Sequence, residues 1–210
     1  MLVCYPLRVG DSLPARIDRA LRRARFGIVT VAGTYALSIA VGMAMVHAGN
    51  HFARDYANRL VSQAHSTSPI LRALHEDKPL KAAALDASAN LLAGVASTLA
   101  GYWAPGGYLA AISRGWVGGI VSVDSRGRSR LADRSEAEYY LITLVLQLIP
   151  YSLVGGAGVN LGIARVRPVG DYAGPKWLLV PREAWRDAGR IYLPAIPLFA
   201  IASAFEFLMR

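Results

Sequence analysis

The chain has 210 residues, of which 54% are hydrophobic and 18% are charged, and its formal net charge is +9. Soluble domains carry about 25% charged residues, so this composition argues against a soluble globular protein. In a membrane protein, Arg and Lys flank the apolar spans and contact anionic lipid headgroups, so the charge does not call for a nucleic-acid partner. The single cysteine, Cys4, excludes an internal disulfide.

Three long stretches, residues 26–46, 87–113 and 139–164, contain no Asp, Glu, Lys or Arg. About 20 apolar residues in a helix cross a hydrocarbon core of about 30 Å. The sequence therefore predicts an all-α fold, a polytopic transmembrane helical bundle of about five spans, one of them short or broken, with interfacial amphipathic helices beside it. The length leaves no room for a second sizeable domain, so residues 26–210 are predicted to form a single transmembrane domain.

Residues 1–25 form a basic segment. Leu13, Ile17 and Leu21 recur every four residues, and arginines occupy the other faces of this helix. The pattern predicts a short interfacial helix on the cytoplasmic side, with its apolar side at the headgroup boundary and its guanidinium groups on lipid phosphate. A secretory signal peptide is the alternative, which the long segment before the apolar run disfavours. An arginine cluster beside the first span favours a cytoplasmic amino terminus and a multi-pass protein of the cell membrane.

The next elements alternate between apolar and amphipathic patterns. The first span is predicted over residues 26–46, and its helix is expected to continue outside the membrane through residues 51–62. Another short amphipathic helix follows over residues 68–78. The second span covers residues 86–103, and a Pro-Gly-Gly break at residues 105–107 ends it, because Pro lacks an amide donor.

Residues 108–123 are less regular, since the stretch is short and contains Arg114 near its middle. A short span, one arm of a broken helix and a re-entrant hairpin all fit this pattern. A polar loop over residues 124–134 leads to the next span, residues 139–164. After a loop rich in Gly, Pro and aromatic residues, the last span is predicted over residues 191–208.

Glycines four residues apart recur in two of these segments. On a helix this spacing removes side chains from one face and lets a neighbouring backbone approach closely. Close helix packing is the main interpretation, and a glycine-lined passage for a solute is the alternative. The helix-packing candidates are Gly115, Gly119, Gly155, Gly156, Gly158 and Gly162.

Five polar residues lie inside predicted spans. Arg114 is the most costly, since an Arg at the bilayer centre costs about 3 kcal/mol on insertion scales. It must reach a surface, face water or pair with a carboxylate. Glu206 is the one acid inside a predicted span, whereas Asp86, Asp124 and Glu138 lie at span ends. Contact of Arg114 with a ligand or a lipid phosphate is the alternative. Asn90, Gln147 and Asn160 are predicted to form hydrogen bonds between helices.

His47, His51 and Asp55 follow one another at four-residue steps, which would place them on one helical face. Such a set can bind a metal ion, but a solvated helix face is the preferred interpretation, because no second cluster accompanies it. No nucleophile–base pair or phosphate-binding loop of known form occurs. We therefore predict no metal, no cofactor and no enzymatic activity.

Three stretches resemble the stage II sporulation protein M family of bacterial and archaeal membrane proteins. Residues 113–119 (SRGWVGG) are similar to the Asn-Gly of that family with its later glycine. Residues 147–162 resemble its glycine-rich span, and residues 202–207 (ASAFEF) resemble its closing alanine-rich helix with a late Glu. The likeness covers roughly residues 80–210. The family residues that carry over are Gly115, Gly119, Gly158, Gly162 and Glu206.

The chain departs from the family pattern at its titrating positions. Arg114 stands where the family has Asn, Gln147 stands where it has Glu, and Ile142 and Thr143 occupy the positions of a Pro-His pair. Mechanisms that need that His or Glu are therefore in doubt for this chain.

The resemblance implies a non-enzymatic membrane protein that works in an assembly. We predict a scaffold or subunit of a membrane complex, in a homo-oligomer or with another membrane protein. The alternative is a transporter or channel component for an anionic solute or a lipid headgroup. The break at residues 105–107 and the nearby Arg114 favour this alternative, because broken helices often line transporter sites.

Overall fold

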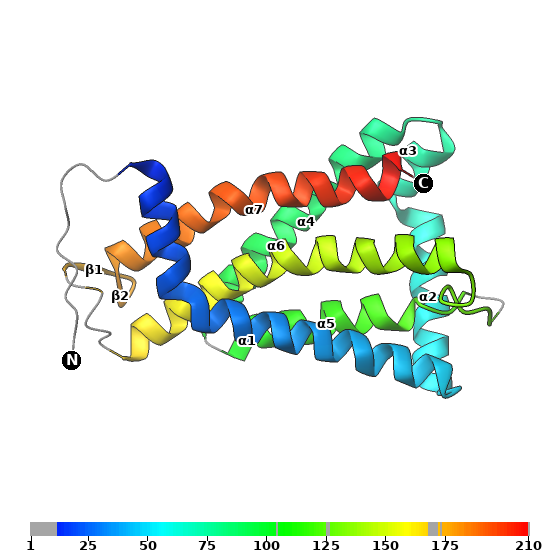
Figure 1. Ribbon diagram of the computed structural model, residues 1–210, viewed down its shortest axis with the longest axis horizontal. Coiled ribbons are helices and arrows are strands. Elements are labelled where there is room, and N and C mark those ends of the chain that lie inside the picture. The colour runs from blue at the N-terminus through cyan, green and yellow to red at the C-terminus, as the bar shows by residue number, and fades with distance from the viewer. Residues whose placement is uncertain (1–11, 104, 125–126, 168–171, 173, 210) are drawn as a thin grey trace.

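The computed structural model describes residues 12–103, 105–124, 127–167, 172 and 174–209. The described part of the chain is an all-α helical bundle with one small hairpin, as predicted (Figure 1). Its elements are α1 (Leu13–His47), α2 (His51–Thr67), α3 (Pro69–His75), α4 (Pro79–Gly101), α5 (Pro105–Ile120), α6 (Arg134–Val166), β1 (Lys176–Trp177), β2 (Val180–Pro181) and α7 (Arg182–Leu208). Cys4 and the rest of residues 1–11 lie outside the described residues.

Four helices, α1, α4, α6 and α7, are long and apolar enough to cross a membrane. This confirms that the chain is a membrane protein with several transmembrane helices. In Figure 1 these helices run lengthwise, and α2 lies across one end of the bundle. The amino-terminal part of α1 lies across the opposite end, where an interfacial helix was expected.

The predicted interfacial helix and first span form one continuous helix of 35 residues, α1. The predicted continuation of this helix into residues 51–62 is wrong. The chain turns between α1 and α2 at Gly49, whose φ is +79°. Asn50 then caps α2, because its side-chain oxygen accepts a hydrogen bond from the backbone N–H of Ala53 at 3.0 Å.

Most of the stretch 108–123, for which a short span, a broken helix and a re-entrant hairpin were all considered, lies in the single uninterrupted helix α5, which ends at Ile120. At 1.5 Å per residue its 16 residues extend about 24 Å, short of a hydrocarbon core of about 30 Å. The helix packs along α1 in a parallel direction, because Tyr108 meets Thr30 and Gly115 meets Tyr35.

Helix α6 occupies the centre of the bundle and contacts α1, α4, α5 and α7. Every residue from 154 to 162 is buried, which explains the small side chains of this stretch. The loop predicted over residues 165–190 is shorter than expected, because α7 begins at Arg182 and not near residue 191. The first turns of α7 contain charged residues, and Arg190 pairs there with Glu183 and Asp187. A search for apolar stretches could therefore not locate the start of this helix.

Candidate functional site

Two glycines of α5 place its backbone directly against α1. A Cβ atom at Gly115 would lie 2.5 Å from the carbonyl oxygen of Tyr35. A Cβ atom at Gly119 would collide with the carbonyl oxygen of Ile39. From the α1 side, Gly42 approaches Trp116 in the same way. Only residues without a Cβ fit at this crossing.

Helix α6 uses two further glycines to approach α1 and α4. A Cβ at Gly156 would lie 2.5 Å from the Cα of Ile28, and one at Gly27 would lie 2.6 Å from the carbonyl oxygen of Gly156. A Cβ at Gly158 would lie 2.6 Å from the carbonyl oxygen of Thr98. The other two candidates on this helix, Gly155 and Gly162, are also buried.

Sequence reasoning missed the counterparts of these glycines, Gly27, Gly42 and Gly101. Each of them lies in a helix, and a glycine makes a helix less stable than an alanine would. A glycine inside a predicted helix was therefore the sequence signal that could have identified these contact positions. The glycine faces lie against helices of the same chain, so packing within the chain accounts for them. A partner chain must therefore use another surface.

A chain of hydrogen bonds links α4, α6 and α7 inside the bundle. The Tyr151 hydroxyl donates to Asn90 Oδ1 at 2.8 Å. Asn90 Nδ2 donates to Asp86 Oδ2 at 2.8 Å, and the Ser203 hydroxyl donates to the same carboxylate oxygen at 2.7 Å. Asp86, which the sequence placed at a span end, is thus the acid at the centre of this network.

Arg114 lies beside this network on α5. Its Cζ atom is 4.9 Å from the centre of the Tyr151 ring, a cation–π contact. Among the described residues no carboxylate lies within 4.0 Å of its guanidinium group, although it interacts electrostatically with Asp86. Glu206, the acid considered from the sequence, lies near the end of α7, where its backbone oxygen accepts a hydrogen bond from Tyr139 at 2.6 Å.

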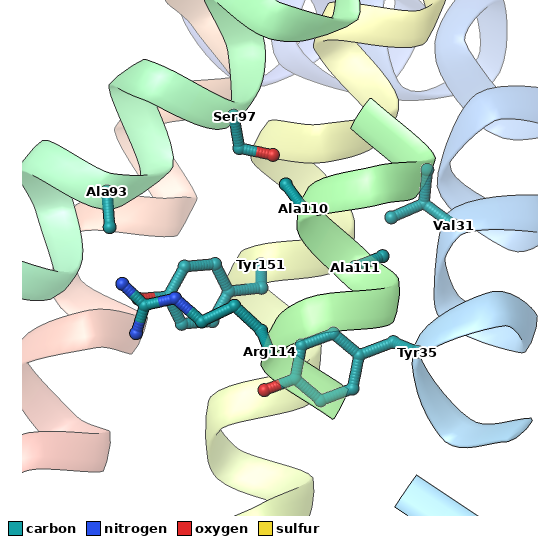
Figure 2. Close-up of a pocket in the computed structure, with 8 residues that line it drawn as sticks. All are labelled: Val31, Tyr35, Ala93, Ser97, Ala110, Ala111, Arg114 and Tyr151. Atoms are coloured by element: carbon teal, nitrogen blue, oxygen red, sulfur yellow. The ribbon is translucent and has the colours of Figure 1, made fainter. Parts of the chain in front are cut away.

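A small cavity adjoins Arg114 between α1, α4, α5 and α6. Its volume is about 20 Å³, enough for about one water molecule. Figure 2 shows the Arg114 side chain reaching from α5 across the Tyr151 ring toward α4. The lining residues are Val31, Tyr35, Ala93, Ser97, Ala110, Ala111, Arg114 and Tyr151.

The hydrogen bond of Tyr151 gives a direct test of this network. Because a hydrogen bond between membrane helices is worth about 0.6 kcal/mol on average, Tyr151→Phe should destabilise the bundle by about that amount while keeping the ring under Arg114. Unfolding in detergent measures the change. Tyr56→Phe is the control, since the Tyr56 hydroxyl forms no hydrogen bond with the described residues. Equal stability of both variants would contradict the assignment.

The other predicted polar residues lie elsewhere. Asn160 Nδ2 donates to the Tyr172 hydroxyl at 2.8 Å, near the other end of α6. Burial raises the pKa of that Tyr172 hydroxyl above its ordinary value. Gln147 Oε1 is buried and accepts no hydrogen bond from the described residues.

The prediction that His47, His51 and Asp55 share one helical face is wrong. The turn between α1 and α2 separates His47 from the other two. Both ring nitrogens of His47 lie within hydrogen-bond distance of other atoms, 2.8 Å from the Met43 carbonyl oxygen and 2.9 Å from Ser129 Oγ. Over the described residues no group of three or more His, Cys, Asp or Glu could hold a metal ion.

A second charged cluster joins the amino-terminal part of α1 to the start of α7. Asp187 is completely buried, and its two carboxylate oxygens accept hydrogen bonds from Arg23 at 3.0 Å and from Arg190 at 2.5 Å. Glu183 accepts a second hydrogen bond from Arg190 at 2.6 Å. Arg23 therefore does not reach lipid phosphate as predicted, because its partner is a carboxylate 164 residues away in the sequence.

The packed face of this part of α1 also differs from the prediction. Ala20 and Ala24 are buried against α6, α7 and the hairpin. Leu13, the first residue of the predicted stripe, is 57% exposed, and Ile17 and Leu21 are half-buried. Small side chains thus form the fully buried face of this segment, with Leu21 packed partly against the same core and Leu13 left at the surface.

Comparisons with protein family models, with curated proteins and with solved structures found no match.

Proposed function

We propose that this membrane protein is a non-enzymatic scaffold or subunit of a membrane complex, and that another membrane-embedded chain covers the surface around Arg114. The supporting observation is the position of this residue. Gly115, the next residue, packs against Tyr35, which lies near the middle of the charge-free stretch 26–46. Arg114 is therefore near the mid-depth of the apolar region, and its side chain is exposed on the bundle surface.

An exposed Arg at this depth is unfavourable in lipid. Asp86, the acid with which it interacts electrostatically, already accepts two hydrogen bonds and forms no ion pair with it within 4.0 Å. The surface beside Arg114 is apolar, since Ala110 and Val117, one turn before and one turn after it on α5, are only half-buried. A partner helix with a carboxylate or amide would pair with the guanidinium group and cover these side chains, at a lower free energy than contact with lipid tails.

Photo-crosslinking in the membrane tests this proposal. A photoreactive amino acid at Val117 should form one discrete protein adduct, because this half-buried side chain lies one turn after Arg114 on the same face of α5. The same group at Leu37, which is 67% exposed on α1 at a similar depth, is the control. Adding Arg114→Gln should remove the adduct at Val117 by removing the charge that the partner recognises.

The adduct mass identifies the partner. Twice the mass of the chain indicates a homo-oligomer, and any other mass indicates a different membrane protein. Adducts with lipid alone at Val117, or an adduct that Arg114→Gln leaves unchanged, would overturn the proposal. The family resemblance and the cytoplasmic amino terminus remain predictions that accompany this proposal.

A transporter or channel component for an anion is the second candidate, and one observation favours it. Arg114 borders a cavity and has no carboxylate at ion-pair distance among the described residues. In liposomes, uptake of a radiolabelled anion such as phosphate or sulfate would then fall on Arg114→Gln. If liposomes with the unmodified protein and liposomes with Arg114→Gln both took up no more anion than empty liposomes, transport of those anions would be excluded.

A further inference from the structure

The hairpin before α7 has an unusual turn. Lys176 pairs with Pro181 and Trp177 pairs with Val180, so Leu178 and Leu179 form a two-residue loop. Their φ angles are +50° and +62°. Hairpin loops with two positive φ angles strongly favour Asn-Gly or Asp-Gly, because a Cβ is strained there. Two leucines in such a loop are therefore unusual, and their backbone is strained.

The tip of this hairpin is apolar and open. Trp177 is 53% exposed, Leu178 is 58% exposed and Leu179 is 62% exposed. The next residue, Val180, is completely buried in the core that α1, α6 and α7 share. The hairpin is thus held at its base, while three consecutive large apolar side chains project outward. In water such a surface would be unfavourable.

The tip is also held in place by two hydrogen bonds. Trp185 Nε1 donates to the backbone oxygen of Trp177 at 3.1 Å, and the two indole rings meet edge to face at 5.2 Å. The Tyr102 hydroxyl donates to the backbone oxygen of Leu178 at 3.0 Å. These bonds come from α7 and from the end of α4, so the tip has a defined position relative to the bundle.

That position is the boundary of the apolar region. Tyr102 directly follows Gly101, which packs on Gly158 of α6. Two residues earlier on α6, Gly156 packs on Gly27, at the start of the charge-free stretch of α1. Tyr102, and with it the hairpin tip, therefore lies at the level where the chain changes from apolar to basic.

Cations and aromatic rings surround the tip. Arg165 lies 4.6 Å from the centre of the Tyr102 ring and 4.5 Å from that of Trp103. Lys176 and Arg182 are exposed on either side of the hairpin. Aromatic rings at the membrane–water interface together with basic side chains match the chemistry of an anionic headgroup layer.

We propose that residues 177–179 insert into the anionic headgroup layer of the bilayer and set the depth of this end of the bundle. The leucines enter the acyl boundary, the indole ring of Trp177 remains at headgroup level, and Lys176 contacts lipid phosphate. This proposal is independent of any partner at Arg114, because the two surfaces use different residues.

Spin labelling tests the immersion of the tip. In a Cys4→Ser background, which removes the one cysteine of the sequence, a nitroxide is attached to Leu179→Cys and the protein is placed in phosphatidylethanolamine–phosphatidylglycerol vesicles. Collisions with oxygen should exceed collisions with a water-soluble nickel chelate at this site. A label on Lys176→Cys, three residues away, should show the reverse order. If the Leu179→Cys variant folds poorly, a label on Leu178→Cys allows the same collision measurement at the tip.

Two outcomes of the spin-labelling experiment would contradict the proposal. Greater access to nickel than to oxygen at both tip positions would place the tip in water and overturn it. Low access to both reagents would indicate cover by protein and overturn it as well. A Leu178→Asn, Leu179→Gly variant relieves the strained turn, so it should fold at least as well in detergent. In vesicles the tip of this variant should no longer insert into the bilayer. A nitroxide on Trp177→Cys would report this change as more collisions with the nickel chelate and fewer with oxygen.

Discussion

Replacing Asp187 with Ala should destabilise the protein by at least about 3 kcal/mol, because breaking a buried ion pair leaves uncompensated charge in the interior. Arg23 and Arg190 would both lose a carboxylate oxygen, and their side chains are only 12% and 20% exposed. Glu183 remains 2.6 Å from Arg190 but 3.9 Å from Arg23, so Arg23 suffers the greater loss. Chemical unfolding in detergent measures the effect.

The same variant should release the amino-terminal part of α1. Among the described residues Arg23 links this segment to α7 by ion pairs, and the apolar contacts of the segment come from the small side chains of Ala20 and Ala24 and from the half-buried Leu21. Hydrogen exchange should therefore accelerate over residues 13–24 before the rest of the bundle. Asp18→Ala is the control, since its ion pair with Arg22 is exposed and contributes little. Unchanged exchange in the Asp187 variant would refute the role of this cluster.

Replacing Gly119 with Ala should destabilise the bundle by about 1–3 kcal/mol. The added methyl group would meet the carbonyl oxygen of Ile39, and it would lie 2.8 Å from the backbone nitrogen of Met43. Backbone atoms cannot move aside by a rotamer change, so α1 and α5 would have to separate. Reversible unfolding of the purified variant in detergent gives the magnitude.

Two other glycines serve as graded controls. Gly33→Ala should stabilise its helix by up to about 1 kcal/mol, because no atom lies within 4 Å of the added methyl group and Ala favours helix. The stability of Gly118→Ala should lie between those of Gly33→Ala and Gly119→Ala, since its methyl group would lie 3.1 Å from the flexible end of Leu144. A Gly119→Ala protein as stable as the Gly33→Ala protein would contradict the close approach of α1 and α5.

The sequence predicted the positions of the spans well. The stretches 26–46 and 139–164 lie within membrane-length helices, and most of 87–113 lies in α4 and the short α5, because lipid excludes charge and each such helix satisfies its own backbone hydrogen bonds. The boundaries were less accurate. Helix α7 begins nine residues before the predicted span, since its first turns are charged and their burial depends on partners elsewhere.

Only part of the candidate site could be predicted from the sequence. Arg114 was evident, because an Arg between apolar residues stands out in any hydropathy pattern. Asp86 was not, since it follows a polar segment and its partner Ser203 lies 117 residues later. Hydrogen bonds across such separations exist only once three helices have assembled.

By itself, the sequence determined that the chain lies in a membrane, which segments are apolar and where glycine replaces larger side chains. These are local properties of residue type and spacing. The tertiary structure decided which glycine meets which backbone, which carboxylate Arg23 contacts, and that two leucines occupy a strained, exposed turn. Those outcomes depend on contacts between distant segments, and helical periodicity identifies the face of a helix but not the neighbour that covers it.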